Sequence, residues 1–180
     1  MQVIFKIFRK MPDGPPAFQE YGLDVEPGTT ILDCLNRIKW EQDGTLAFRK
    51  NCRNTICGSC SMRINGRSAL ACKENISSEV RRFQQAGAIA SSAGAAFGLR
   101  PDGVPVMLIA PLGNLPIIKD LIVDMQPFWQ GLKAVDPAVQ ATPPEGMVGE
   151  FLQSPAERSR LNQVGNCILC GACYSECNAR

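Results

Sequence analysis

The spacing of four cysteines within residues 52–72 constrains this chain more than any other feature of its sequence. The stretch CRNTICGSCSMRINGRSALAC contains them as C-x4-C-x2-C-x11-C, at Cys52, Cys57, Cys60 and Cys72. The first three have the spacing of plant-type 2Fe-2S ligands, for which a fourth cysteine lies further along the chain. The two residues between Cys57 and Cys60 are glycine and serine, and such small residues let backbone N–H groups approach an anionic cluster. We therefore predict a 2Fe-2S site held by these four cysteines.

Two other uses of clustered cysteines compete with this prediction. Structural zinc sites with four cysteines usually show two separate C-x2-4-C pairs, whereas here three cysteines crowd into one loop. Disulfides are typical of secreted chains, but this chain has an odd number of cysteines, nine, and its first residues alternate like a strand rather than forming a signal peptide. The spacing favours an iron–sulfur cluster, and a zinc-stabilised interaction module is the alternative from a different class.

The composition excludes several classes of function. The 180 residues include no histidine, so Ser-His-Asp catalysis, Cys-His catalysis and His-ligated zinc are not available. A net charge of +2 gives no reason to expect a nucleic-acid partner. No apolar run reaches the roughly 20 residues of a membrane-spanning helix. We expect a protein without signal peptide or transmembrane helix, in the cytosol or peripheral on the cytoplasmic side of a membrane.

A second cysteine run lies in GNCILCGACYSECNAR. Cys167, Cys170, Cys173 and Cys177 follow C-x2-C-x2-C-x3-C, the bacterial ferredoxin run, whose fourth cysteine ligates the other cluster of a two-cluster domain. A complete 4Fe-4S site needs a further cysteine from a matching run, and the usual proline after the fourth cysteine is replaced by Asn178. We expect this site to be half built, either because the chain is a fragment, which we favour, or because a partner completes it.

Two features near the cysteines have more than one interpretation. Cys34 lies beside an apolar stripe and 18 positions before the next cysteine, so we expect a buried core thiol rather than a ligand. Three cations lie at or near the start of the first cluster motif, at Arg49, Lys50 and Arg53. They either offset the charge of a cluster or form an exposed basic edge, and the sequence leaves both interpretations open.

Hydrophobic periodicity and turn residues indicate the secondary structure. We predict strands at 2–9, 18–26 and 104–112, a helix within 27–42 capped by Thr29 or Thr30, and a hairpin around Asn65-Gly66. Residues 74–103 are predicted as a helix followed by a flexible, Ala/Gly/Ser-rich insertion. An amphipathic helix is expected over 114–132, with Ile117, Leu121 and Met125 on its core face. A Pro/Gly-rich linker over 134–155 and a short helix over 155–163 should follow.

The order of these motifs resembles the iron–sulfur subunits of the succinate dehydrogenase and fumarate reductase family. The resemblance rests on FRKNCRNTICGSCSMRINGRSALAC, LPIIKDLIVDM and ERSRLNQVGNCILCGAC, and it covers nearly all of the chain except about 74–103. It implies an α+β fold: a β-grasp domain of the plant-type 2Fe-2S ferredoxin-like kind at 1–112, then the start of an α-helical, bacterial-ferredoxin-like domain at 113–180. It also implies that Cys52 and Cys57 hold one iron of the first cluster, and Cys60 and Cys72 the other.

In the second domain, the resemblance implies that Cys167, Cys170 and Cys173 are ligands of a 4Fe-4S cluster and Cys177 of a 3Fe-4S cluster. It implies an electron-transfer subunit without a substrate site of its own, which relays electrons from the FAD of a flavoprotein subunit toward quinone at a membrane anchor. In such proteins the cofactors supply the redox chemistry, and the chain sets their positions and surroundings. Succinate dehydrogenase is the favoured member, and fumarate reductase stays open because the sequence does not set the direction of the reaction.

Overall fold

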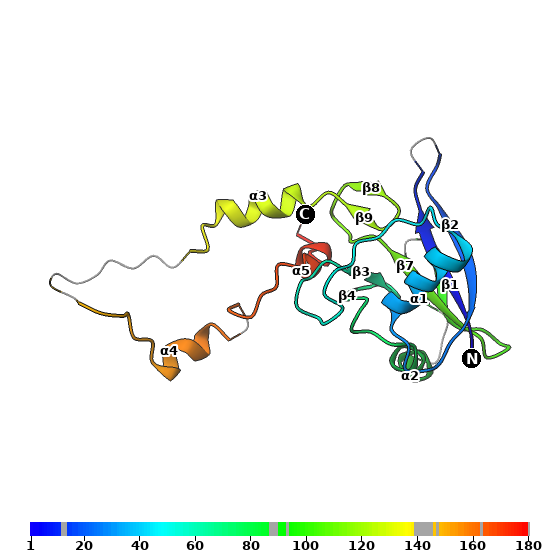
Figure 1. The fold of residues 1–180 in the computed structure, drawn as a ribbon, viewed down its shortest axis with the longest axis horizontal. Helices are drawn as coiled ribbons and strands as arrows, with labels where there is room; N and C mark the ends of the chain where they lie inside the picture. The colour runs from blue at the N-terminus through cyan, green and yellow to red at the C-terminus, as the bar shows by residue number, and fades with distance from the viewer. Residues whose placement is uncertain are drawn as a thin grey trace.

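The N-terminal hairpin begins the sheet of the computed structural model, which describes residues 1–11, 14–86, 90–92, 94–138, 146, 148–162 and 164–179. Strands β1 (Gln2–Arg9) and β2 (Ala17–Asp24) pair antiparallel, as predicted, and the predicted turn between them lies partly outside the described residues (Figure 1). Val3, Phe5 and Ile7 of β1 are fully buried, in agreement with their alternation. Each buried side chain of this size contributes about 1.5–3 kcal/mol to folding.

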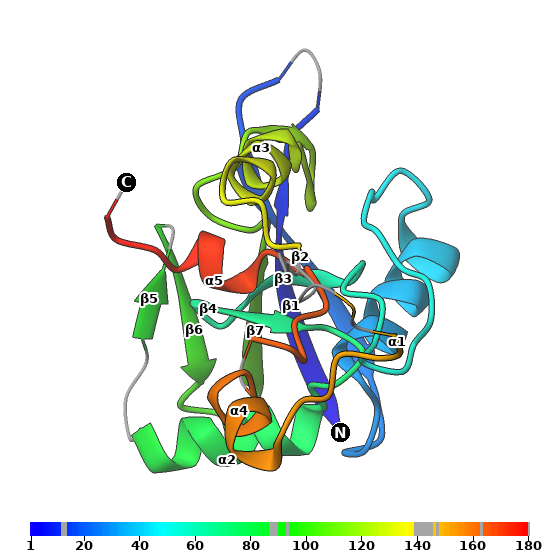
Figure 2. The ribbon, with the colours of Figure 1, turned by 90° about the vertical axis from the view of Figure 1, so that its left-hand side faces the viewer.

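The central sheet is mixed and follows the order β2-β1-β7-β3-β4. Its other strands are β7 (Pro105–Ala110), β3 (Ser61–Ile64) and β4 (Arg67–Leu70). β1 and β7 run parallel, whereas the other neighbouring pairs on this path are antiparallel. An N-terminal hairpin beside a parallel central pair, with a helix across one face of the sheet, is a β-grasp arrangement (Figure 2). The predicted α+β class is confirmed.

Helix α1 (Ile31–Arg37) covers the inner face of this sheet. Thr30 caps the helix, because its hydroxyl oxygen accepts a hydrogen bond of 3.1 Å from the N–H of Asp33. The helix continues into a π-helical turn at Ile38–Gln42, which the N–H of Asp43 closes by bonding to the Ile38 carbonyl at 2.8 Å. This turn leads the chain away from the core and into the region of the first cysteines.

Cys34 lies in the centre of this helix's buried face. Its neighbours Ile31, Leu35 and Ile38 are fully buried, and Cys34 itself has no exposed surface. Burial raises the pKa of its thiol to about 12. The thiol is therefore protonated at neutral pH and inert, which confirms the prediction of a core residue.

The hairpin of β3 and β4 forms around Asn65 and Gly66, as predicted. Both residues have positive φ, 51° and 79°, which is the conformation that a two-residue hairpin turn requires. Cys60 immediately precedes β3, and Cys72 follows β4 by two positions. The hairpin therefore holds the last two cysteines of the first motif at its open end.

Residues 74–103 contain more regular structure than we predicted. The predicted helix is α2 (Ile76–Ala86), but strands β5 (Ala90–Ser92) and β6 (Ala95–Leu99) follow it. β6 pairs with the part of β7 that β3 leaves uncovered, with Gly98 opposite Val106. The expectation of a flexible insertion is thus wrong for 90–92 and 94–99, because the end of β6 pairs with the edge of β7 and β5 pairs in turn with β6. Residues 87–89 and 93 lie outside the described part.

The helix predicted over 114–132 is correct for 126–132 and wrong for 114–125. Strands β8 (Ile117–Lys119) and β9 (Ile122–Val123) form a short hairpin in its first part, and α3 (Gln126–Ala134) begins after this hairpin. Asp120 lies in the turn with φ 47° and is completely buried. Its carboxylate accepts 2.9 Å hydrogen bonds from the N–H groups of Lys10 and Ala47, and these distant contacts override the helical periodicity. Leu121 is nevertheless buried, as its place on the expected core face indicated.

The segment after α3 extends away from the sheet and then returns to it (Figure 1). The predicted short helix is α4 (Pro155–Arg160), which begins with a capping box between Ser154 and Glu157, while residue 163 lies outside the described part. Helix α5 (Ala172–Ser175) then lies beside β4 (Figures 1 and 2). Residues 135–138, 146 and 148–154 of the predicted linker form neither helix nor strand, and the others between 139 and 147 are not described.

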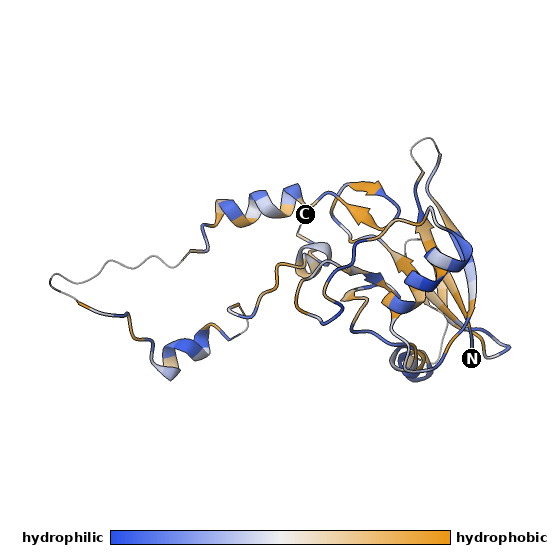
Figure 3. Cartoon of the chain, viewed as in Figure 1, coloured by the Kyte–Doolittle hydropathy of each residue, from blue (hydrophilic) through white to orange (hydrophobic). Residues whose placement is uncertain are grey.

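The distribution of apolar residues separates the sheet from this extended segment. Apolar residues gather on the strands of the sheet and on β8 and β9 (Figure 3). In the extended segment, Val148, Leu152 and Leu161 are exposed. Within the described residues, no helix combines the length and the apolar character needed to cross a membrane.

Candidate metal centre

The first cysteine loop (residues 52–60) has an unusual backbone. Arg53, Thr55 and Gly58 adopt left-handed conformations, with φ of 57°, 61° and 70°. Glycine does this freely, whereas for other residues the left-handed conformation costs about 1–2 kcal/mol, and a β-branched residue such as threonine is rare there. Alternating left-handed residues turn successive N–H groups toward one side of a loop, as in anion-binding nests. The backbone of this loop is therefore suited to surround a negatively charged group.

The four predicted ligands of the first cluster lie close together, as two pairs. Cys52 lies close enough to Cys57 to affect the pKa of its thiol, and Cys72 and Cys57 both lie close enough to affect that of Cys60. Hydrogen bonding by Ser59, with a further contribution from Cys52, lowers the pKa of Cys57 to about 6. Burial, together with the neighbouring thiols of Cys72 and Cys57, raises the pKa of Cys60 to about 11.

A backbone N–H and a hydroxyl of the first cysteine loop lie close to sulfur. The N–H of Asn54 lies 3.3 Å from the Cys52 Sγ, and the hydroxyl of Thr55 lies 3.9 Å from the Cys72 Sγ. Hydrogen bonds to ligand sulfurs stabilise thiolates and tune a cluster's potential. Thr55 lies between Cys52 and Cys57, so its contact also links that part of the loop to Cys72.

The pairing distinguishes between a single ion and a two-iron cluster. A mononuclear zinc site needs four ligands around one point, whereas a two-iron core takes two thiolates at each end. Two adjacent thiol pairs with N–H and hydroxyl donors around them fit the 2Fe-2S donor set better than the zinc donor set.

The outer side of the loop is open to solvent. Ile56, between Thr55 and Cys57, keeps 67% of its surface exposed. Arg49, Lys50 and Arg53 are all exposed, and Lys50 contacts α1: its Nζ donates to the Asn36 side chain at 2.6 Å and lies 5.0 Å from the Trp40 ring centroid. These positions describe an exposed basic rim beside the cysteines.

The second cysteine run shares the local geometry of the first but not its convergence. The N–H of Leu169 donates to the Cys167 Sγ at 3.4 Å, and Leu169 and Gly171 are left-handed, with φ of 55° and 76°. Cys170 is half-buried, whereas Cys167, Cys173 and Cys177 are exposed. The structure therefore forms the backbone of a cluster-binding run, and it does not bring these four thiols together as one ligand set.

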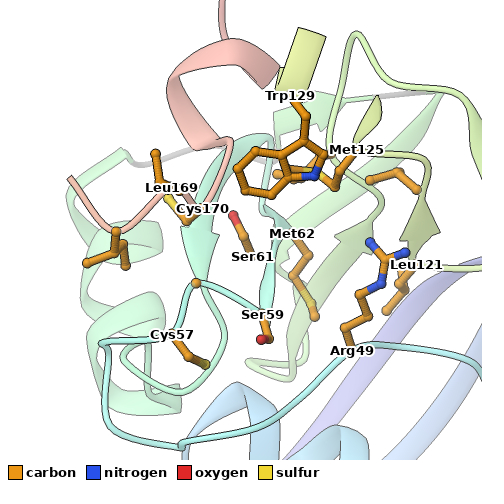
Figure 4. Close-up of a pocket in the computed structure, with 14 residues that line it drawn as sticks. Arg49, Cys57, Ser59, Ser61, Met62, Leu121, Met125, Trp129, Leu169 and Cys170 are labelled. Atoms are coloured by element: carbon orange, nitrogen blue, oxygen red, sulfur yellow. The ribbon is translucent and has the colours of Figure 1, made fainter. Parts of the chain in front are cut away.

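The two cysteine motifs meet at Gly58. A cavity of about 470 Å³ lies between them, with Cys57 on one wall and Cys170 on the other (Figure 4). Trp129 and Met125 from the start of α3 and Arg49 from the segment before Cys52 complete much of its lining. The two motifs are 110 positions apart in sequence when counted from Cys60 to Cys170, and they nevertheless share one cavity.

Sequence reasoning missed two side chains that shape this region. Ser61 Oγ is buried in the cavity lining without a hydrogen-bond partner in the structure, and only its place directly after Cys60 pointed to it. Asp120 fixes the chain between β8 and β9 to Ala47, just before the first cysteine loop. The signal for Asp120 was a carboxylate between the apolar residues of LPIIKDLIVDM, which is costly to bury without partners.

A family profile described as "2Fe-2S iron-sulfur cluster binding domain" matches residues 4–130. The chain belongs to this family. Over 96% of its length it is also similar to two curated proteins named as mitochondrial succinate dehydrogenase (ubiquinone) iron-sulfur subunits. It is 38% identical over 179 residues to that of Candida glabrata and 34% identical over 177 residues to subunit 3 of Arabidopsis thaliana. These similarities confirm the family resemblance that the motifs indicated.

The similarity covers only part of those relatives. The chain spans 61% of the Candida glabrata protein and 50% of the Arabidopsis thaliana protein. In fold, it is similar to a chain of the "Mycobacterium smegmatis Sdh1 complex in the apo form", with a TM-score of 0.73 and 26% identity. That match covers 98% of this chain and 63% of the other. This 2Fe-2S family member therefore shares its fold with a subunit of a multi-protein complex.

Proposed function

We propose that the chain holds a 2Fe-2S cluster through Cys52, Cys57, Cys60 and Cys72 and passes electrons through it. The observation that carries this proposal is the arrangement of these thiols as two adjacent pairs in a loop of left-handed residues. Because each iron of such a cluster takes two thiolates, Cys52 and Cys57 would hold one iron, and Cys60 and Cys72 the other. The bound cluster would supply one-electron redox chemistry.

The chain's own residues hold and surround these ligands. Cys60 is almost completely buried and joins the loop to β3, which fixes one thiol to the core of the sheet. The Asn54 N–H and the Thr55 hydroxyl donate toward sulfurs and would stabilise their negative charge. The exposed Ile56 leaves the outer side of the loop free for a redox partner.

The complete role that we propose is that of the electron-transfer subunit of a succinate dehydrogenase complex. Electrons would come from the FAD of a flavoprotein subunit and go toward quinone at membrane anchor subunits. The chain would have no substrate site and would lie peripherally, on the cytoplasmic side of the membrane. The names of the curated relatives support this assignment. The alternative is the iron–sulfur subunit of a fumarate reductase, in which the same relay runs toward fumarate.

The second cysteine run keeps the assignment that the resemblance gave it. Cys167, Cys170 and Cys173 would be ligands of a 4Fe-4S cluster, and Cys177 of a 3Fe-4S cluster, with further ligands supplied from outside this run. The left-handed backbone and the Leu169 N–H bond to Cys167 support cluster binding. Cys167, Cys173 and Cys177 are exposed in this structure, and Cys170 is half-buried.

Iron and acid-labile sulfide per chain, measured on anaerobically purified protein, test the proposed function. We expect about two irons and two sulfides, with a rhombic EPR signal after reduction by dithionite. Markedly more iron would show that the second run also binds a cluster. Zinc without iron would refute the electron-transfer role and support a zinc-stabilised interaction module instead.

Electron transfer itself is tested with Cys57→Ser. The variant should still bind the flavoprotein subunit, because Cys57 does not form the exposed rim of the loop. It should lose electron transfer from the flavin to an artificial acceptor dye through this chain. Unchanged transfer in a variant that binds normally would refute the relay.

A further inference from the structure

The second cysteine run is held against the body of the fold by a small set of contacts, which we call the docking seam. It comprises Gly58, Ser68 and Gly113 on one side and Cys170, Ser175 and Glu176 on the other. Gly58 belongs to the first cysteine loop, and Cys170 belongs to the second run. The seam therefore joins the two cysteine motifs directly, through this chain's own side chains and backbone.

Close packing at Gly58 forms the end of the seam that lies inside the first cysteine loop. Gly58 is buried, and a Cβ added to it would lie 2.9 Å from both the Cα and the Cβ of Cys170. The same Cβ would lie 3.2 Å from the Ile168 carbonyl oxygen. Real Cβ atoms essentially never show a contact below 3.0 Å, so the second run reaches this position because residue 58 has no side chain. The backbone of the loop is thus part of the surface on which the second run docks.

Hydrogen bonds and a second close contact form the other end of the seam. The Gly113 N–H donates to Ser175 Oγ at 2.7 Å, and the Ser68 N–H donates to the Glu176 carboxylate at 2.8 Å. A Cβ at Gly113 would lie 2.9 Å from the Ser175 carbonyl oxygen. These contacts hold α5 beside β4, and together with the Gly58 contact they define one docked position of the second run.

Helix α5 depends on this docking for its existence. It spans only Ala172–Ser175, and a helix this short is not stable by itself in water. The Ser175 N–H donates to the Gly171 carbonyl at 3.0 Å, and the Glu176 N–H donates to the Ala172 carbonyl at 3.2 Å. Slow hydrogen exchange of these two amides therefore reports that the second run is docked.

We propose that cluster binding at the first cysteine motif strengthens the docking of the second run. This inference rests on the proposed function. Iron bound by Cys57 and Cys60 would fix the backbone of the two residues between them, one of which is Gly58, because metal binding and local folding are coupled. The close contact at Gly58 leaves the loop no room to move toward the second run. Docking in the observed position therefore requires the loop to keep this shape.

The coupling has a direction in assembly and a reciprocal effect. The first motif would be loaded before the second run is held in place, so the first cysteine loop is a template for the second. Because linkage between two equilibria is reciprocal, docking also strengthens cluster binding at the first motif. Gly58 is the positioning residue of this coupling, since it lies in the loop and touches Cys170.

The experiment compares the full chain without metal and after anaerobic loading with iron and sulfide to about two irons per chain. Hydrogen exchange, measured by mass spectrometry, follows the amides of Ser175 and Glu176. Iron is counted in every sample. In the wild type, we expect loading to slow the exchange of these amides about tenfold, because docking becomes more favourable.

Three variants identify the origin of the slowing. In Gly58→Ala, the added Cβ displaces Cys170, so both amides should exchange rapidly with and without iron. Gly103→Ala is the control and should match the wild type, because Gly103 has a positive φ of 81° and no atom within 4 Å of the added Cβ. Cys60→Ala removes a ligand of the first motif and keeps the four cysteines of the second run, so iron and sulfide should no longer slow the exchange.

Other outcomes would overturn the inference. Equal exchange rates in the metal-free and loaded wild type would refute the coupling and leave the proposed function intact, and this comparison depends on no variant. Slowing that persists in Cys60→Ala would show that iron acts on the second run directly. Slowing of wild-type size in iron-loaded Gly58→Ala would show that the Gly58 contact does not carry the coupling. A wild-type chain that binds no iron would refute the proposed function and the inference together.

Discussion

The two cysteine motifs have the same local geometry and different surroundings. In each, the N–H two positions after the first cysteine donates to its sulfur, at 3.3 Å for Cys52 and 3.4 Å for Cys167. Each also has a left-handed glycine directly after a cysteine, Gly58 in one and Gly171 in the other. The first motif is enclosed by β3 and β4, whereas the second lies between an extended segment and the short helix α5.

This difference shows what a short motif does and does not determine. The spacing of cysteines and glycines determines the path of the backbone and which N–H groups face sulfur. Tertiary structure determines whether the thiols meet: the β3–β4 hairpin holds Cys60 and Cys72 together, and no comparable element holds Cys173 and Cys177. Within the part of the chain that the structure describes, Cys173 and Cys177 are both exposed.

The largest expected effect of this difference is on iron content. Cys60→Ala removes a ligand from the convergent motif, and we expect iron to fall from about two per chain to nearly none. Cys173→Ala removes a cysteine from the motif that does not converge, and we expect the iron content to stay at the wild-type value. Iron and sulfide analysis of the two purified variants measures this directly. Equal loss of iron in both variants would contradict the distinction between the two motifs.

The next largest effect should come from Asp120, which ties the junction hairpin to the start of the first cysteine loop. Its carboxylate is completely buried and lies 3.1 Å from the Arg9 Nε, besides accepting from Lys10 and Ala47. Asp120→Ala removes one ion-pair partner of the buried Arg9. It also leaves the N–H groups of Lys10 and Ala47 without their hydrogen-bond acceptor. We expect the free energy of unfolding, measured with urea, to fall by about 3–5 kcal/mol.

Asp102→Ala is the matched control for this substitution. Asp102 pairs with Arg100 at 3.4 Å, and about half of each side chain is exposed. Such a surface pair contributes about 0–1 kcal/mol. If the control variant lost as much stability as Asp120→Ala, the anchoring role of Asp120 would be wrong.

The contacts of Asp120 also show why some elements of the fold could be predicted from the sequence and others could not. Patterns that depend on neighbours in sequence were predictive: the alternation of β1, the Thr30 cap, the Asn65-Gly66 turn and the apolar stripe around Cys34. The helix expected over 114–132 was wrong for 114–125, because Asp120 bonds to residues 73 and 110 positions away, which no local pattern contains. The hairpin of β5 and β6 was missed for the same reason, since small residues become a strand only where β7 offers an edge.

The candidate site likewise contains features that local sequence patterns indicate and features that depend on long-range packing. The eight motif cysteines were selected by their spacing, because iron–sulfur ligands follow fixed local intervals, and their roles as ligands remain predictions. The division of the first four between two irons, which the family resemblance implied, also remains a prediction. The contact between Gly58 and Cys170, and the unpaired Ser61 hydroxyl beside it, depend on how the two motifs pack. The division of the chain at residue 112 remains a prediction.

A pair of leucines compares the body of the molecule with the extended segment. Leu35 of α1 is fully buried, whereas Leu152, before α4, is 91% exposed. We expect Leu35→Ala to lower the free energy of unfolding by about 2–5 kcal/mol, because it removes transfer energy and leaves a cavity. Leu152→Ala should change it by less than about 0.5 kcal/mol. A similar loss in both would show that the extended segment packs against the body in solution.

The smallest expected effect concerns pH and the hairpin that holds Cys72. Glu74, two positions after Cys72, is buried, and burial alone would raise the pKa of its carboxyl. Hydrogen bonds and charge from Arg67 and Arg82 outweigh burial and lower that pKa to about 2, from 4.5 in the unfolded chain. A group whose pKa is lower in the folded state stabilises the protein above its unfolded value and loses this contribution as the pH falls.

The free energy of unfolding should therefore decrease as the pH falls from about 5 toward 2, and Glu74→Gln should show a shallower decrease over this range. Glu20→Gln is the control, because Glu20 pairs with Lys6 at the surface and a surface pair contributes little. Urea unfolding at a series of pH values measures both slopes. If Glu74→Gln kept the full wild-type slope, the two arginines would not hold Glu74 ionised. The end of the β3–β4 hairpin would then owe its stability to apolar packing alone, and acid would not loosen the first cysteine motif in preference to the second.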